Sequence, residues 1–440
     1  MTATDNVVHE PYLKSEMDLF QTPFVDLSAV GGGFVELNPI ASVDGNDSVE
    51  FYYPSSSEQF LDLTQTLLRV KAEVTKGNGA ALETTDKVAM INNSLHSMFS
   101  HARVALNDVD VLSTASNYAI KSYIETVLNN SLEVKKSILT AQQFHIDDNV
   151  TVTSPEPETG EHNKGLDARY AVCRNGVFEM VGRVHADIFN CTKFLLPGVA
   201  MKVKFTLAEP QFVLMTAATN ENYTFKIREA QLVVYKVDVS PTYSTAIERS
   251  LQEKDAAYEF TRTETLVHTI TGGLSTKTLD NLFPGILPKR ITIVFVKNSA
   301  WVGSFTENPL NFHHHNMSRI VVRVDGRSIS HPVKTNFDTS EFASAFMTLY
   351  GNRDGGNADP GCGISMEEYK DGFTATCYDL TPDNNASTPG YVYPDQRGNL
   401  SIEFGFREPL TDSINVVILS EFDSILTIDE QRVVTTSFSD

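Results

Sequence analysis

Residues 319–350 read RIVVRVDGRSISHPVKTNFDTSEFASAFMTLY, and this stretch contains the pattern that decides the fold. Its first six residues are a strand-like run rich in β-branched side chains. The run ends in Asp325-Gly326, a strong signal for a tight hairpin turn. Apolar side chains at helical spacing, among them Phe342 and Phe346, then predict a single amphipathic helix that begins near Ser340.

The same order of features occurs in the first half of the chain. A tight turn at Asn107-Asp108 is followed by a helix that begins near Asn117, roughly 220 residues before its counterpart and far beyond any solenoid period. The apolar positions of this helix are Tyr118, Ile120, Tyr123, Ile124, Val127 and Leu128, with Lys121, Glu125 and Asn129 on the opposite side. Two similar β-domains in tandem are therefore expected, each with one helix that covers a sheet edge or end.

The strands themselves show two patterns. Apolar residues at 68, 70, 72 and 74 alternate with charged residues at 69, 71 and 73, which predicts a strand with one buried and one wet face. Residues 291–296, ITIVFV, are almost continuously apolar and predict burial on both faces. Alternation of the first kind is typical of antiparallel sandwiches.

The length of 440 residues suits two domains of about 200 residues each. We expect an N-terminal arm at 1–45, a first β-domain at 46–240, a helical linker at 241–256 and a second β-domain at 257–440. Apolar anchors at Leu19 and Phe20 suit an arm that packs on its own domain or on a neighbour; the alternative is a disordered tail.

Composition excludes several classes of function. The formal net charge of -21 argues against a surface that wraps nucleic acid, because phosphate binding needs clustered Lys and Arg, and Lys193, Lys202 and Lys204 are too few. The four cysteines form no CxxC pair and fit reduced thiols of a cytosolic or nuclear protein. The first residues resemble no signal peptide, so we expect the chain to stay on the cytosolic side of membranes.

Two histidine patterns invite a chemical interpretation. In a strand, the consecutive side chains of His313, His314 and His315 point to opposite faces, so they do not easily converge on one metal ion, and we expect a solvated loop. His185 and Asp187 are two residues apart and could form a hydrogen-bonded pair. Since no Ser or Cys nucleophile is tied to them, we expect a structural role.

Two loop patterns are less specific. Gly31-Gly32-Gly33 lacks the Lys and Ser/Thr of a phosphate loop and indicates flexibility. Four acidic residues flank a Gly-rich loop but do not match the spacing of a calcium-binding EF-hand; they are Asp354, Asp359, Glu367 and Glu368. The sequence therefore predicts no catalytic, cofactor-binding or metal-ligating residue, no cofactor and no enzymatic activity.

Short motifs spread over nearly the whole chain resemble the major capsid proteins of Polinton/Maverick elements and the related adintoviruses. The motifs, in the family's order, are LFQTP at 19–23, FLDLTQTL at 60–67, NNSLHSMF at 92–99, GRVHADIF at 182–189, LLPGV at 195–199, LPKRI at 287–291, GSFTENPLNF at 303–312, YDLTP at 378–382 and EFD at 421–423. None of them is catalytic.

The resemblance implies an all-β fold of two tandem jelly-roll β-sandwiches, a double jelly roll in which each sandwich carries a short helix. It further implies a homotrimer that forms a pseudo-hexagonal capsomer of an icosahedral shell around double-stranded DNA, in contact with neighbouring capsomers and with minor capsid or penton proteins. Such a protein is made in the host cytoplasm, is assembled there or in the nucleus and resides in the virion. Outer loops could meet a host receptor or glycan. Tyr118, Tyr123, Phe342 and Phe346 are expected to matter for packing.

Three alternatives stay open from the sequence. A minor capsid or vertex protein is disfavoured, because a vertex normally needs one jelly roll per subunit. A tandem β-sandwich could instead bind glycans through loop aromatics such as Tyr391 and Tyr393. An enzyme on a β-sandwich would need a pair of convergent carboxylates, and nothing in the sequence selects such a pair.

Overall fold

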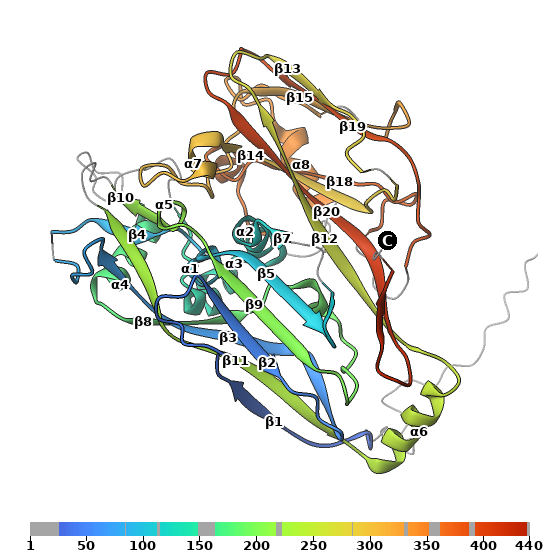
Figure 1. Cartoon of the computed structure of the whole chain (residues 1–440). Helices are drawn as coiled ribbons and strands as arrows, with labels where there is room; N and C mark the ends of the chain where they lie inside the picture. The colour runs from blue at the N-terminus through green and yellow to red at the C-terminus, as the bar shows by residue number, and fades with distance from the viewer. Residues whose placement is uncertain are drawn as a thin grey trace, which may run out of the picture.

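The computed structural model describes residues 26–83, 85–111, 115–147, 163–216, 222–283, 285–329, 333–351, 361–386 and 392–437. These residues form two antiparallel β-sandwiches that lie side by side (Figure 1). The first sandwich is drawn mainly in blue and green, and the second in yellow to red.

In the first sandwich, one sheet has the order β1-β11-β3-β8 and the other β2-β9-β5-β6, with β7 also paired to β5 and a separate β4-β10 pair. The bounds are β1 (Ala29–Leu37), β2 (Ser48–Tyr53), β3 (Gln59–Lys76), β4 (Val88–Met90), β5 (Phe99–Leu106), β6 (Val109–Asp110), β7 (Ala115–Ser116), β8 (Phe178–Arg183), β9 (Met201–Leu207), β10 (Leu214–Thr216) and β11 (Tyr223–Val239).

In the second sandwich, the sheets are β12-β20-β14-β18, with β21 on β20, and β13-β19-β15-β16, with β17 on β15. The bounds are β12 (Ala256–Ile270), β13 (Thr276–Leu279), β14 (Arg290–Lys297), β15 (Met317–Val324), β16 (Arg327–Ser328), β17 (Val333–Lys334), β18 (Ala375–Asp379), β19 (Leu400–Phe406), β20 (Ile414–Ile428) and β21 (Val434–Thr436).

The two sandwiches have the same topology. If the β4-β10 pair and β21 are left out, and the two short strands on β5 count as one, as do those on β15, the strand order is the same in both sandwiches. It is first-eighth-third-sixth in one sheet and second-seventh-fourth-fifth in the other. This is the order of a jelly roll made of two Greek keys. The predicted fold, two jelly rolls in tandem, is confirmed.

The short elements that mark the duplication are also confirmed. The turns have positive φ at both central residues: 45° and 65° at Asn107 and Asp108, 49° and 77° at Asp325 and Gly326. The predicted helices are α2 (Tyr118–Asn129) and α8 (Ala343–Gly351).

The helices outnumber the one per sandwich that we expected. Between β7 and β8 the first sandwich carries α2 and three further helical segments, and between β17 and β18 the second carries α8 and α9. The remaining bounds are α1 (Ser94–Ser97), α3 (Leu132–Lys136), η2 (Ile138–Gln142), α4 (Lys164–Arg174), η3 (Asp187–Asn190), α5 (Pro210–Val213), α6 (Pro241–Leu251), α7 (Asn298–Val302) and α9 (Met366–Lys370). We retain the division of the chain at residues 240 and 257, on either side of α6, as a proposal.

The N-terminal arm expected at 1–45 needs a correction, because Ala29–Leu37 pairs with β11 as the outer strand β1. The glycines in this strand hide its alternation. A Cβ on Gly32 would lie 2.7 Å from both the carbonyl oxygen of Lys236 and the hydroxyl of Tyr235, so glycine lets the Tyr235 side chain lie against the strand. The flexible role assigned to this glycine run is therefore wrong.

Candidate functional site at the junction of the two sandwiches

Helix α2 lies between the two sandwiches (Figure 1). Tyr118 at its start belongs to the hydrophobic core of the first sandwich, whereas Tyr123 and Ile124 belong to that of the second. The Tyr123 ring contacts the Phe312 ring of the second sandwich edge-on, with 5.6 Å between centroids. The helix therefore contributes side chains to the hydrophobic cores of both sandwiches.

Burial of both sides of α2 corrects one expectation. Lys121 was placed on the wet side of the helix, but its side chain is only 1% exposed. Its Nζ lies 2.5 Å from Oδ1 of Asp187 and 3.6 Å from Oε1 of Glu125. Burial alone would lower the pKa of Lys121, but these two carboxylates raise it above its ordinary value.

Asp187 carries this ion pair across the junction. Its other carboxylate oxygen accepts a hydrogen bond of 2.8 Å from the backbone N–H of Thr263 on β12, in the second sandwich. Burial raises the pKa of Asp187 even though Lys121 counteracts the shift. Three elements from both sandwiches, α2, η3 and β12, thus meet at one buried carboxylate.

His185 and Asp187 do not act as a pair. The Nδ1 of His185 lies 2.7 Å from Oε2 of Glu125, and its backbone N–H donates to the hydroxyl of Tyr118 over 3.2 Å. Both residues therefore fasten the segment after β8 to α2, which agrees with the predicted structural role.

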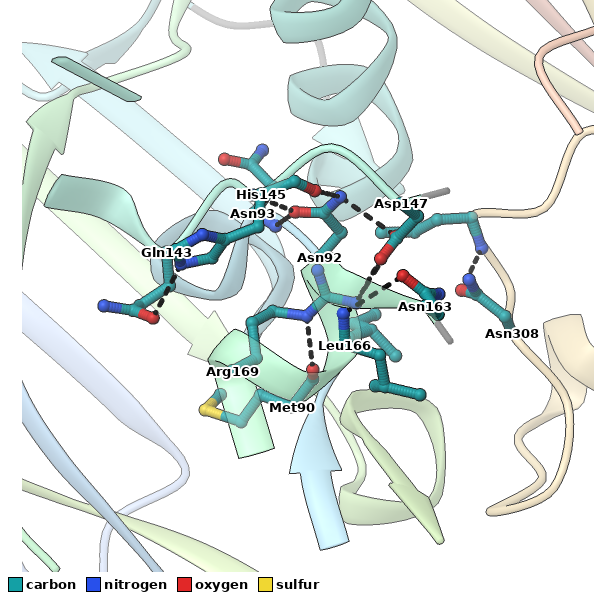
Figure 2. A network of polar contacts seen from close by, with 12 residues as sticks. Met90, Asn92, Asn93, Gln143, His145, Asp147, Asn163, Leu166, Arg169 and Asn308 are labelled. Carbon is teal, nitrogen blue, oxygen red and sulfur yellow. Dashed lines mark hydrogen bonds and ion pairs between the residues drawn. The ribbon is translucent and has the colours of Figure 1, made fainter. Parts of the chain in front are cut away.

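A second polar network holds the helical insertion against the first sandwich. Arg169 on α4 donates to Asp147 over 2.9 Å and to the carbonyl of Met90 over 3.1 Å (Figure 2). Asn92 donates to the same carboxylate over 3.1 Å. Arg169 is 1% exposed and Asp147 2%, so this ion pair is buried.

Further hydrogen bonds cross between the sandwiches. Lys135 on α3 donates over 2.5 Å to the carbonyl of Cys362, and burial lowers its pKa to about 8. Arg432, in the turn between β20 and β21, donates to the carbonyl of Pro197 over 2.8 Å and to Glu248 over 2.5 Å. Asn107 in the predicted turn donates to the carbonyl of Arg432 over 2.8 Å. The sequence does not reveal the contacts of Lys135 and Arg432, because an isolated charge carries no periodic signal.

The histidine run is not the solvated loop that we expected. His314 is 7% exposed and stacks on Phe337 with 3.9 Å between ring centroids. Burial, together with the neighbouring His313, His315 and Lys370, lowers the pKa of His314 to about 3. His314 is therefore buried against Phe337 of the second core, whereas His313 and His315 are half-buried.

The other candidates are placed as follows. Asp354, Asp359 and Tyr391 lie outside the described residues, whereas Glu368 caps α9 by accepting from the backbone N–H of Ser365. The Tyr393 hydroxyl donates to Asp383 over 2.9 Å and lies 3.0 Å from the carbonyl of Asn385. Tyr393 lines a cavity of about 40 Å³. The four cysteines are all buried, and no disulfide joins them.

No group of three or more His, Cys, Asp or Glu side chains in the described ranges is arranged to hold a metal ion. Within the same ranges, no helix is both long and apolar enough to cross a membrane.

Comparison with known proteins gives one sequence relative. No protein-family model matches the chain. An uncharacterized protein of Caenorhabditis elegans is 26% identical over 401 residues, which cover 87% of this chain and 91% of that protein.

Solved structures show the fold. A chain of the Sputnik virophage has a TM-score of 0.62 at 9% identity, over 98% of this chain and 93% of that one. A chain of the PBCV-1 virus capsid has a TM-score of 0.59 at 10% identity, over 96% and 100%. The Faustovirus major capsid protein has a TM-score of 0.57 at 9% identity, over 96% and 93%. Over almost its whole length, this chain therefore has the double jelly-roll fold that these viral chains share.

Proposed function

We propose that the chain is the major capsid protein of an icosahedral double-stranded DNA virus or virus-like element, and that it works by assembly. One observation carries the proposal: two jelly rolls of identical strand order are joined through the buried helix α2, and viral capsid chains match this design along their whole length. Two similar sandwiches joined in one body suit the subunit of a shell, because they present two similar surfaces to neighbouring subunits in a fixed relative orientation.

The oligomer we propose is a homotrimer. Three copies of a chain with two similar sandwiches place six similar units around the trimer axis, which gives a pseudo-hexagonal capsomer that tiles a shell. Neighbouring capsomers and minor capsid or penton proteins would be its partners in the virion. With a net charge of -21, the chain would contact the genome only indirectly.

We propose further that the source is a Polinton-like or adintovirus-like element. The motifs quoted above support this assignment. The relative in Caenorhabditis elegans supports it as well, because an element carried in an animal genome would leave such a relative among that animal's proteins.

We propose no enzymatic activity, and no observation favours the glycan-binding alternative. The hydroxyl of Tyr393 is engaged by its own loop, and the cavity beside it, at about 40 Å³, is far below the size of a small-molecule site, which is about 300–1,000 Å³.

The solution mass of the purified full chain tests the proposal. Light scattering or sedimentation should give three times the subunit mass of 48.7 kDa, and negative-stain images should show hexagonal particles. A monomer that persists at high concentration would contradict the trimer and favour a binding module.

A further inference from the structure

An apolar groove opens at the end of the molecule where the first sandwich, α6 and the start of β12 meet. Its volume is about 440 Å³. Most of its lining is apolar, including Phe60, Phe194, Leu196, Tyr243, Ile247 and Tyr258. Phe194 and Tyr243 are 40% and 46% exposed, so the groove presents aromatic surface to solvent. The volume lies within the range of about 300–1,000 Å³ that is usual for binding sites.

The chain itself enters the fold at this groove. Ser28 and Ala29 form part of its lining, and the carbonyl of Ser28 accepts a hydrogen bond of 2.8 Å from the backbone N–H of Ser240. Residues 19–24 are therefore joined to the groove edge through only a few residues of chain. From Ser28 back to Phe20 is eight residues, which span at most about 29 Å when extended.

The tethered segment matches the groove in chemistry. Residues 19–24 read LFQTPF, with Leu19, Phe20 and Phe24 as large apolar side chains in an otherwise polar stretch. Asp18 directly precedes them, and the groove is lined by Lys193, which is half exposed beside Glu259. The match therefore rests on the apolar side chains, because Lys193 is already paired with Glu259 over 3.5 Å.

We propose that residues 19–24 of the same chain occupy this groove, with Phe20 and Phe24 as the anchors. A segment that is already tethered binds at a high effective concentration, so modest contacts suffice. Docked there, it covers Phe194 and Tyr243 and contacts both the first sandwich and β12, so it reinforces the junction from the end opposite α2. The inference does not depend on capsid assembly.

Crosslinking of the full chain tests the docking. In a Thr22→Cys/Tyr243→Cys variant, the two new thiols lie on the segment and on the groove wall, while the four native cysteines are buried. A short bismaleimide should give an intrachain crosslink, identified by peptide mass, in a protein that runs as a monomer on a denaturing gel. The matched control is Thr22→Cys/Val302→Cys, because Val302 is 74% exposed on α7, at the other end of the molecule from α6 (Figure 1).

The outcomes separate the possibilities. A crosslink yield several-fold above that of the control supports docking, provided that adding Phe20→Ser and Phe24→Ser to the same variant reduces it to the control level. Covalent dimers would place the segment in a neighbour's groove, and equal yields in the two cysteine pairs would mean that the groove does not hold the segment; either result overturns the proposal.

Discussion

The third strands of the two sandwiches, β3 and β14, occupy the same place in the same topology but have different outer faces. On β3 the outer face is wet and charged: Lys71 pairs with Glu229 over 2.7 Å, and Glu73 pairs with Arg228. On β14 every residue from Arg290 to Val296 is buried, and Val294 lines a cavity of about 10 Å³ together with residues of α2. The two sandwiches therefore have the same strand order. The side chains on the outer face of each third strand differ because α2 covers β14 and not β3.

The helices explain why the covering is one-sided. The helical segments between β7 and β8 belong to the first sandwich, but α2 among them packs against the second sandwich. In the second sandwich, α8 packs against its own sandwich. Phe346 contacts Tyr369 of α9 with 5.6 Å between ring centroids, and Phe342, just before α8, stacks on Phe337 at 4.9 Å. The junction is therefore built by one copy of the repeat, and the predictions below test that asymmetry.

The largest effect should come from giving β14 the chemistry of β3. Val294→Lys places an unpaired charge between α2 and the second core, and we expect the free energy of unfolding to fall by about 3–5 kcal/mol. The reverse change on β3, Lys71→Val, removes an exposed ion pair and should alter the free energy by less than about 1 kcal/mol. Urea unfolding of both variants measures the difference, and equal losses would refute the asymmetry.

The next effect concerns the buried ion pair at the junction. Lys121→Met leaves Asp187 buried without its cation, and we expect a loss of about 2–3 kcal/mol at pH 7. The loss is limited because burial already raises the pKa of Asp187, so this carboxyl can take up a proton.

This variant should also change its pH dependence. An acid whose pKa is higher in the folded state than in the unfolded state binds protons more tightly when folded, so stability declines as pH rises from about 3.9 through the raised pKa. Relative to the unmodified chain, Lys121→Met should therefore lose less stability at pH 5 than at pH 7. A loss independent of pH would mean that Asp187 stays ionised.

Much of this architecture could be read from local patterns, and the rest depends on contacts that no local pattern records. The turns at Asn107 and Asp325 and the alternation at 68–74 are local, and the structure confirms them. Strand β1 escaped detection because its glycines remove the alternating side chains. The burial of Lys121 and His314 also escaped, because each side chain is covered by residues distant in sequence, Asp187 and Phe337.

The buried histidine of the second sandwich should make that sandwich acid-sensitive. Because the pKa of His314 is lowered to about 3, the unfolded chain binds an extra proton between pH 3 and about 6.5, so stability falls as pH falls through that window. His314→Phe preserves the stack on Phe337 and should reduce the loss between pH 7 and pH 5 by up to about 2 kcal/mol. Unfolding midpoints at both pH values measure it, with the exposed His101→Phe as the control; an identical acid loss in the two variants would contradict the assignment.

The smallest effect compares the two hairpin turns that mark the duplication. Asp108 holds φ at 65° with its side chain 94% exposed, whereas its counterpart Gly326 holds φ at 77° without a Cβ. Asp108→Gly should therefore raise the free energy of unfolding by about 0.5 kcal/mol, and Gly326→Ala should lower it by about 1 kcal/mol.

A substitution at Asn107 distinguishes the backbone strain of the turn from the hydrogen bonds that the turn makes to neighbouring segments. It also has positive φ, but its side chain accepts from the backbone N–H of Ala200 over 2.8 Å and donates to the carbonyl of Arg432. Asn107→Gly should thus destabilise the chain by about 1 kcal/mol despite relieving the backbone, because two hydrogen bonds are lost. If Asn107→Gly instead stabilised the chain, as expected for Asp108→Gly, the hydrogen bonds of the Asn107 side chain would contribute nothing to stability. Arg432 would then join the two sandwiches only through its contacts with Pro197 and Glu248.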